Sequence, residues 1–116
     1  MGIWNRSRLR HSVGIETKGG RFTSLIAKGT PLPVSLTETF TTGDPDQSSI
    51  QVSPCQGENP LAVSNEQLGV FDVTGIPPAA AGEPQILVTF HVDVRGAFSI
   101  TAKDANSGRE LPVLRR

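Results

Sequence analysis

The feature that most constrains the fold is an alternation of apolar and polar side chains between Gln85 and Val94, interrupted only by Leu87. Ile86, Val88 and Phe90 fall on one face of an extended chain, whereas the residues between them point to the other face. A period of two residues indicates a strand with one buried face and one solvated face. Arg95-Gly96 then permits a tight reversal, and the apolar alternation resumes at Phe98, which predicts an antiparallel hairpin.

The rest of the chain repeats this pattern in short segments separated by turns rich in Gly, Pro, Asn and Asp. The further predicted strands are Val13 to Thr17, Arg21 to Ala27, Val34 to Thr42, Ser48 to Gln56, Leu68 to Thr74, Phe98 to Ala102 and Glu110 to Leu114. Proline cannot donate a ladder hydrogen bond, so Pro54 should mark an edge, a bulge or the end of its strand. The pattern predicts an all-β fold, an antiparallel β-sandwich of two four-stranded sheets.

The length and net charge of the chain limit the kinds of protein that it can be. A chain of 116 residues is enough for one domain, and its 11 basic and 11 acidic side chains cancel. We therefore expect neither a nucleic-acid nor a membrane partner. The single cysteine, Cys55, suits neither an internal disulfide nor a usual zinc site, so it is interpreted as a partly buried, reduced thiol. With no signal peptide or apolar run of spanning length, the expected location is the cytoplasm.

The amino-terminal residues carry Arg6, Arg8 and Arg10 and lack the strand pattern. We expect residues 1–11 to form a disordered tail and residues 12–116 to form the domain. The arginines with Trp4 could contact nucleic acid or lipid, but three cations on a tail are usually only solvated.

Several short sequence motifs between about Ser12 and about Leu114 resemble those of one known family, and they occur in the same order and at the same spacing. They are GIETKGG (14–20), LIAKGTPLP (25–33), QGE (56–58), LGVF (68–71), GIPP (75–78), PQILVTF (84–90) and TAKD (101–104). The chain is identified as similar to the substrate-binding β-domain of the heat shock protein 70 (DnaK) chaperones. The resemblance implies a β-sandwich whose loops at one end hold an extended, apolar peptide segment of an unfolded protein.

The same resemblance predicts that this chain lacks the ATP-dependent activities of the family. The family's ATPase domain and helical lid find no counterpart in it, so we expect no cofactor, no ATP-driven gating and no enzymatic activity. ATP would belong to the nucleotide-binding domain.

By resemblance, one apolar pocket and its polar flanks form the peptide site. The pocket comprises Ile15, Phe40, Ile50 and Val52, with Ile86 beneath them. The flanking residues are Thr17, Lys18, Thr41, Thr42, Gly43, Gln47, Ser49 and Gln51. The residue pattern by itself favours a different interpretation, in which Phe40, Ile50 and Val52 are simply core.

Three positions depart from the family pattern. An apolar pair, typically Met and Ala, arches over the peptide in the family, and this sequence has Lys18 and Gly43 there. Ala81 stands where the family has an arginine near the groove. Lys18 should favour peptides with acidic flanks.

Two alternatives remain open at this point. The departures above, together with Pro54, favour a structural remnant that binds no specific ligand or associates with itself through an open groove. An enzyme is the weaker alternative: His91 and Asp93 share a strand face, but the sequence places no nucleophile beside them.

Overall fold

The computed structural model describes residues 7–116, and its chain divides into two compact units. Unit 1 comprises the described residues up to Leu36 together with 53–69 and 91–99, and unit 2 comprises 37–52, 70–90 and 100–116. Strands β3 (Val34–Phe40), β8 (Ile86–Val92) and β9 (Phe98–Asp104) contribute residues to both units. No helix in the described range is long and apolar enough to cross a membrane.

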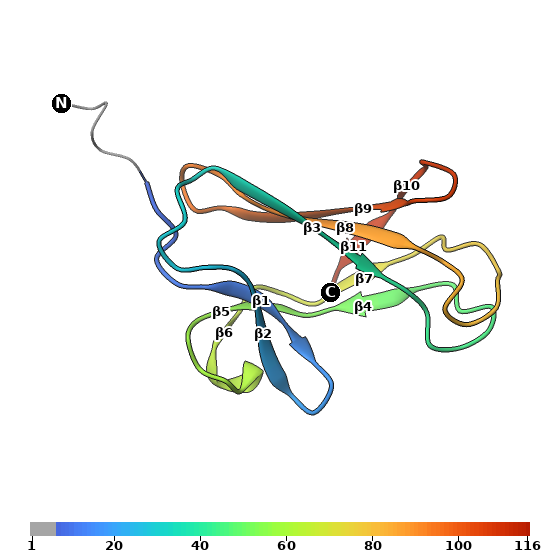
Figure 1. The fold of residues 1–116 in the computed structure, drawn as a ribbon, viewed down its shortest axis with the longest axis horizontal. Helices are drawn as coiled ribbons and strands as arrows, with labels where there is room; N and C mark the ends of the chain where they lie inside the picture. Colours follow the sequence, from blue (N-terminus) through green and yellow to red (C-terminus); the bar gives the residue numbers. More distant parts are fainter. Residues whose placement is uncertain (1–6) are drawn as a thin grey trace. The chain divides into compact units, whose positions relative to one another are not determined.

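Unit 1 is built on an antiparallel sheet with the strand order β2-β1-β5-β6 (Figure 1). Its strands are β1 (Val13–Thr17), β2 (Arg21–Ile26), β5 (Pro54–Gln56) and β6 (Glu66–Gln67), with a short 3-10 helix at Ala62–Ser64. Val13, Ile26 and Cys55 are buried. Because Val13 pairs with Gln56 and Gly14 pairs with Cys55, Val13 and Cys55 lie on opposite faces, so both faces of this sheet contain core residues. The register shifts between Val13 and Gly14, which is an irregularity in the β1–β2 ladder.

Cys55 behaves as a small apolar side chain in this core. It is a free thiol with no exposed surface. Burial, with a smaller contribution from the charge of Glu16, raises the pKa of the Cys55 thiol. A buried thiol with a raised pKa is a poor nucleophile and a poor metal ligand, so its role is packing.

The residues just before β1 also belong to unit 1. Leu9 is only 4% exposed, and its amide donates to the Thr30 carbonyl oxygen at 2.9 Å. Arg8 forms an isolated antiparallel bridge with Pro31. Ordered contacts therefore begin several residues before Ser12, at which the sequence placed the domain boundary; the part of the expected tail at residues 1–6 lies outside the described residues.

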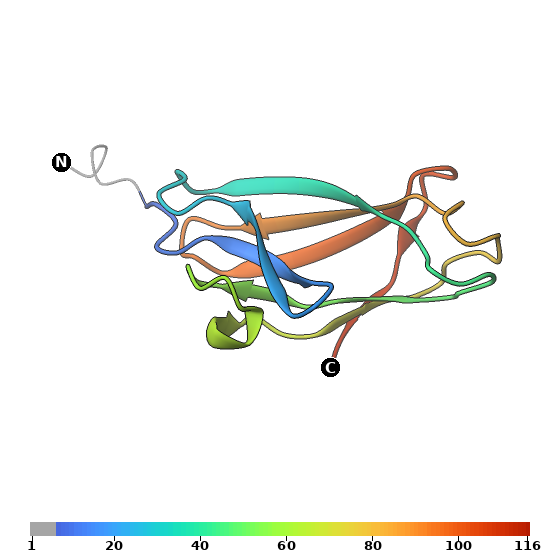
Figure 2. The same cartoon turned by 60° about the horizontal axis from the view of Figure 1, so that its bottom comes forward.

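Unit 2 contains parts of two sheets, with the strand orders β10-β9-β8-β3 and β11-β7-β4. The added strands are β4 (Ile50–Val52), β7 (Phe71–Val73), β10 (Glu110–Leu111) and β11 (Val113–Arg115). Figure 2 shows these two sheets of unit 2 as two layers. Val88, Phe90 and Val73 have no exposed surface, so the alternating face of β8 supplies core as its pattern predicts.

The all-β class and the antiparallel pairing are confirmed, whereas the sheets differ in number from the prediction. Within residues 7–116 the strands form sheets of four, four and three strands in place of two four-stranded sheets. The predicted strand 48–56 is divided at Ser53, just before Pro54, and the predicted strand 110–114 is divided at Pro112. Proline lacks an amide hydrogen, so the chain leaves one ladder at each position and joins another.

Glu58 ties the start of β1 to the turn after β5 within unit 1. Its carboxylate accepts hydrogen bonds from the Ser12 hydroxyl at 2.7 Å and the Ser12 amide at 3.0 Å, and it contacts His11 Nδ1 at 3.2 Å. The Ser12 hydroxyl hydrogen bond is the largest cause that lowers the pKa of Glu58; desolvation opposes it, and the Ser12 amide and His11 add smaller lowering contributions. The ionised carboxylate is therefore the form that the folded chain favours.

We expect Glu58→Gln to flatten the dependence of folding stability on pH in acid. Because the pKa is lower in the folded chain, the stabilisation is fully present above the ordinary carboxyl pKa and is lost as the pH falls through the folded value. Urea midpoints at a series of pH values from neutral to acid should converge for wild type and Glu58→Gln at the acid end. Glu66→Gln, an exposed change on β6, is the matched control. An unchanged gap between wild type and Glu58→Gln across the series would contradict the role of Glu58.

Candidate functional site

Most of the residues that the resemblance assigns to a peptide site fall in unit 2, on three strands and one loop. Phe40 ends β3, Ile50 and Val52 lie on β4, and Ile86 begins β8. The polar candidates are in the loop that joins β3 to β4 or on β4 itself: Thr41, Thr42, Gly43, Gln47, Ser49 and Gln51. The structure therefore gathers the polar flanks next to Phe40 and the β4 strand.

Gln47 shapes this loop from within. Its side-chain oxygen accepts hydrogen bonds from the amides of Gly43 at 3.0 Å and Asp44 at 3.1 Å. Its amide nitrogen donates to the Ser49 carbonyl oxygen at 2.7 Å. Both ends of the Gln47 side chain are thus engaged inside the loop, so Gln47 holds the loop's conformation and does not offer a free polar group to a ligand.

The same loop is bonded to the irregular segment 75–84 of unit 2. Four hydrogen bonds join the two: the Thr41 hydroxyl to the Pro84 carbonyl (2.6 Å), the Gly82 amide to the Thr42 carbonyl (3.0 Å), the Asp46 amide to the Ala79 carbonyl (2.8 Å) and the Ile76 amide to the Ser48 carbonyl (3.1 Å). Segment 75–84 has no apolar–polar alternation, so its sequence predicts only an irregular connection and not this support. The prolines of segment 75–84 could have indicated this support, because they restrict the backbone and their carbonyl oxygens can accept hydrogen bonds.

The apolar candidates of unit 2 are mostly core. Ile50 is 8% exposed, Val52 2% and Ile86 1%, whereas Phe40 is half-buried. The Phe40 ring packs against Phe90, with ring centroids 6.5 Å apart and a 54° tilt. A ligand side chain could touch the exposed part of Phe40 with little rearrangement, whereas Val52 and Ile86 are too deeply buried for direct contact.

The remaining candidates lie on β1 and its turn in unit 1. Ile15 is buried at 8% exposure and pairs with Pro54 across the sheet. The Thr17 hydroxyl lies 3.0 Å from the Thr23 hydroxyl on β2, so it already has a partner. Lys18 is exposed, in the turn that follows β1.

Thr42 has an unusual environment for a polar side chain. It is 4% exposed, and its hydroxyl has no hydrogen-bond partner anywhere in the described part of the chain. A buried hydroxyl without a partner loses its hydration and gains nothing in return. Its neighbour Thr41 is the opposite case, because the Thr41 hydroxyl donates to Pro84.

Thr42→Val should raise the free energy of unfolding by about 1 kcal/mol, because valine fills the same volume without an unpaired hydroxyl. Thr41→Val is the matched control, and it should lower the free energy of unfolding by about 1 kcal/mol through the loss of its bond to Pro84. Urea denaturation of the two variants measures both changes. The same sign for the two substitutions would show that Thr42 is not the unpaired group that the structure indicates.

A serine does lie beside His91, which the sequence did not reveal. Ser35 Oγ on β3 lies 2.6 Å from His91 Nδ1 on β8. Asp93 does not complete a triad, because its carboxylate accepts hydrogen bonds from the amides of Ala97 and Arg95, and the Ala97 bond is the largest cause that lowers its pKa. The Ser35–His91 pair therefore resembles the neighbouring Thr37–Thr89 pair, at 2.8 Å, as a polar cross-strand contact.

Metal chemistry finds no support in the described range. Among residues 7–116 no group of three or more His, Cys, Asp or Glu side chains is placed to hold a metal ion. Nothing in the side-chain arrangement described above points to catalysis.

The described residues form an antiparallel all-β protein. Comparison with known proteins gives its family. The family model described as Hsp70 protein matches residues 9–113, so this chain belongs to the Hsp70 family. A similar relative is Chaperone protein DnaK from Methanothermobacter thermautotrophicus strain Delta H, which is 46% identical over 102 residues. That alignment covers 88% of this chain and 17% of the relative, so the chain spans a small part of the relative's length.

Proposed function

We propose that this chain is a non-enzymatic, cytoplasmic chaperone module that binds extended apolar segments of unfolded polypeptides. The observation that carries the proposal is the family match over residues 9–113, which includes the whole loop from Thr41 to Ser49. That loop is preorganised by Gln47 and by the hydrogen bonds to segment 75–84, so it loses little freedom on binding.

Binding in this proposal has two physical contributions. An apolar ligand side chain buries itself against Phe40, with Ile50 and Val52 behind it, which contributes about 1.5–3 kcal/mol for a leucine. Backbone hydrogen bonds to the extended ligand add roughly 0.5–1.5 kcal/mol each. The cost of ordering a flexible peptide opposes these terms, so the expected affinity is micromolar, about −8 kcal/mol.

The proposal is tested by fluorescence anisotropy of a labelled, leucine-centred heptapeptide with neutral flanks. Saturable micromolar binding, with competition by the unlabelled peptide, supports it. A folded wild-type protein that shows no binding at hundreds of micromolar contradicts it.

The alternative of a remnant or self-associating fragment draws on one observation, the near-complete burial of Val52 and Ile86. If Val52 and Ile86 stay buried, no pocket for a ligand side chain opens next to Phe40. Sedimentation of the protein across a concentration series distinguishes the two outcomes, because a self-associating fragment gains mass with concentration while it still fails to bind the heptapeptide.

A further inference from the structure

A concave site that contains none of the candidate peptide residues lies in unit 1. It is a cavity of about 610 Å³, within the usual range of roughly 300–1,000 Å³ for ligand pockets. Three arginines line it, Arg8, Arg10 and Arg95, and no acidic side chain does. Leu32 and Val94 line it as well, so the cavity combines positive charge with apolar surface.

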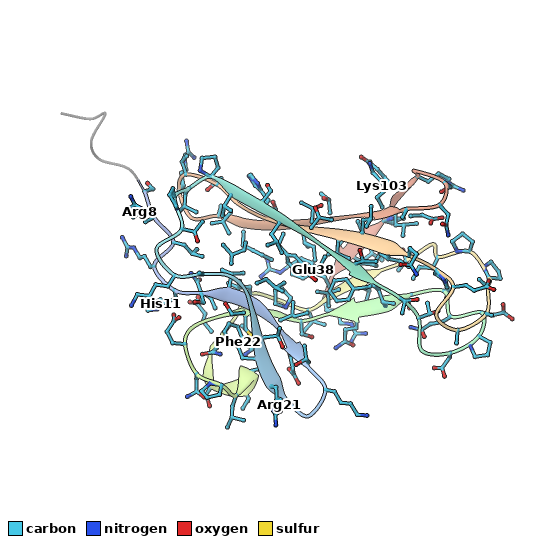
Figure 3. The ribbon with its side chains drawn as sticks, viewed as in Figure 1. Arg8, His11, Arg21, Phe22, Glu38 and Lys103 are labelled. Atoms are coloured by element: carbon cyan, nitrogen blue, oxygen red, sulfur yellow. The ribbon has the colours of Figure 1, made fainter. Side chains whose placement is uncertain are left out.

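One wall is the segment from Ser7 to Arg10, which is fixed by main-chain hydrogen bonds. The Gly29 amide donates to the Leu9 carbonyl at 2.7 Å and the Leu32 amide donates to the Ser7 carbonyl at 3.0 Å. The Arg8 guanidinium donates to the Gly29 carbonyl oxygen at 3.0 Å. Figure 3 labels Arg8 on this segment. The wall therefore exists before any ligand arrives.

The opposite wall is the β8–β9 turn, which Asp93 holds. One carboxylate oxygen of Asp93 accepts hydrogen bonds from the Arg95 amide at 2.9 Å and the Ala97 amide at 2.8 Å. The turn also needs Gly96, whose φ of +85° is rare for other residues. Arg95 is thus presented on a braced turn.

The cations at this cavity are available to a ligand. Arg10 and Arg95 are exposed, and neither side chain forms a hydrogen bond or an ion pair with another of residues 7–116. The acidic group nearest to Arg95 along the chain is Asp93, and its hydrogen bonds come from backbone amides. A planar guanidinium binds a carboxylate through two parallel hydrogen bonds, which a lysine cannot do.

We propose that this arginine cavity binds an acidic segment of another polypeptide, one that carries carboxylates on either side of an apolar side chain. Arg8, Arg10 and Arg95 supply the positive charge, and Leu32 and the 54%-exposed Val94 supply the apolar contact. A polypeptide fits better than a nucleic acid, because the apolar lining has no counterpart on a phosphate backbone and the chain carries no net charge to attract a long polyanion.

The test is anisotropy of a labelled heptapeptide of alternating glutamate and leucine. Wild type should bind it saturably, and binding should weaken as salt is raised. The double variant Arg10→Gln/Arg95→Gln should weaken binding by about tenfold or more. Both side chains are exposed, so the double variant should fold normally, and its urea midpoint checks this.

Matched controls separate this site from the peptide groove and from net charge. Arg109→Gln changes charge at an exposed position of unit 2 and should leave the affinity unchanged. The same comparison is repeated in a Val52→Phe background, which blocks the proposed peptide groove, because the leucines and glutamates of the probe also suit that groove with its Lys18. In this background the neutral leucine-centred heptapeptide should not displace the acidic one.

Three outcomes in the Val52→Phe background would overturn the proposal: equal affinity with and without the two arginine substitutions, an equal loss in Arg109→Gln, or displacement by the neutral heptapeptide. Tighter binding of a single-stranded oligonucleotide than of the acidic peptide, abolished by the same double variant, would replace the polypeptide by a phosphate polymer. Because the groove is blocked in this background, these outcomes do not depend on whether the groove binds its own peptide.

Discussion

Val52→Phe should weaken binding of the leucine-centred heptapeptide by at least about tenfold, which corresponds to about 1.4 kcal/mol. Val52 lies on β4 with 2% of its surface exposed. A phenyl ring at this position needs more space than the core offers, so in the proposed pocket it should occupy the volume that a ligand side chain would enter. Anisotropy of the labelled peptide measures the loss.

Overpacking also lowers stability by roughly 1–3 kcal/mol, so a loss of binding has to be separated from a loss of fold. Val92→Phe is the matched control, because Val92 is also 2% exposed but lies in the unit 1 part of β8, outside the candidate peptide residues. It should cost similar stability and leave binding largely intact. Phe40→Ala gives a second measure, because it removes the exposed side of the pocket. Retained binding in both Val52→Phe and Phe40→Ala would place the peptide elsewhere.

Gly14→Ala should lower the free energy of unfolding by about 2–3 kcal/mol, because the added methyl group has no room. Gly14 lies in β1, between β2 and β5, and a Cβ there would collide with the Thr23 carbonyl oxygen. It would also lie 2.8 Å from the Thr23 carbonyl carbon and 2.9 Å from Cε1 of Phe22. The Thr23 atoms are backbone, so the β1–β2 ladder has to open to make room.

Gly43→Ala is the matched control for this prediction. No heavy atom lies within 4 Å of a Cβ at Gly43, and its φ is not in the left-handed region. Its stability should therefore change by less than about 0.5 kcal/mol. Thermal unfolding compares the two variants, and equal melting temperatures would show that β1 and β2 are less closely apposed than the structure indicates.

The strand positions could largely be predicted from the sequence. The β1 range Val13–Thr17 was predicted to the residue, and β8 falls within the predicted 85–94. This succeeds because a period of two residues is a local property of the chain. The number of sheets was harder to predict, because the partner that a strand takes after Pro54 or Pro112 depends on distant residues.

The candidate site was predictable only through the family resemblance. Alternation alone favoured a core role for Ile50 and Val52, and their burial agrees with that role. It gave no sign that Gln47 bonds within its own loop, or that Thr42 lacks a partner while Thr41 has one. Peptide binding at these residues stays a prediction.

By itself, the sequence determined the all-β class, the antiparallel hairpins and the family. These follow from the local apolar–polar alternation, the turn residues and the short motifs shared with the family. Only the tertiary structure decided which polar groups have partners and where charges converge. Ser12 meets Glu58 across 46 residues of chain, and Arg10 and Arg95 line the same cavity from distant segments. The physical reason is that hydrogen bonding and charge act through space, whereas a sequence pattern records only neighbours along the chain.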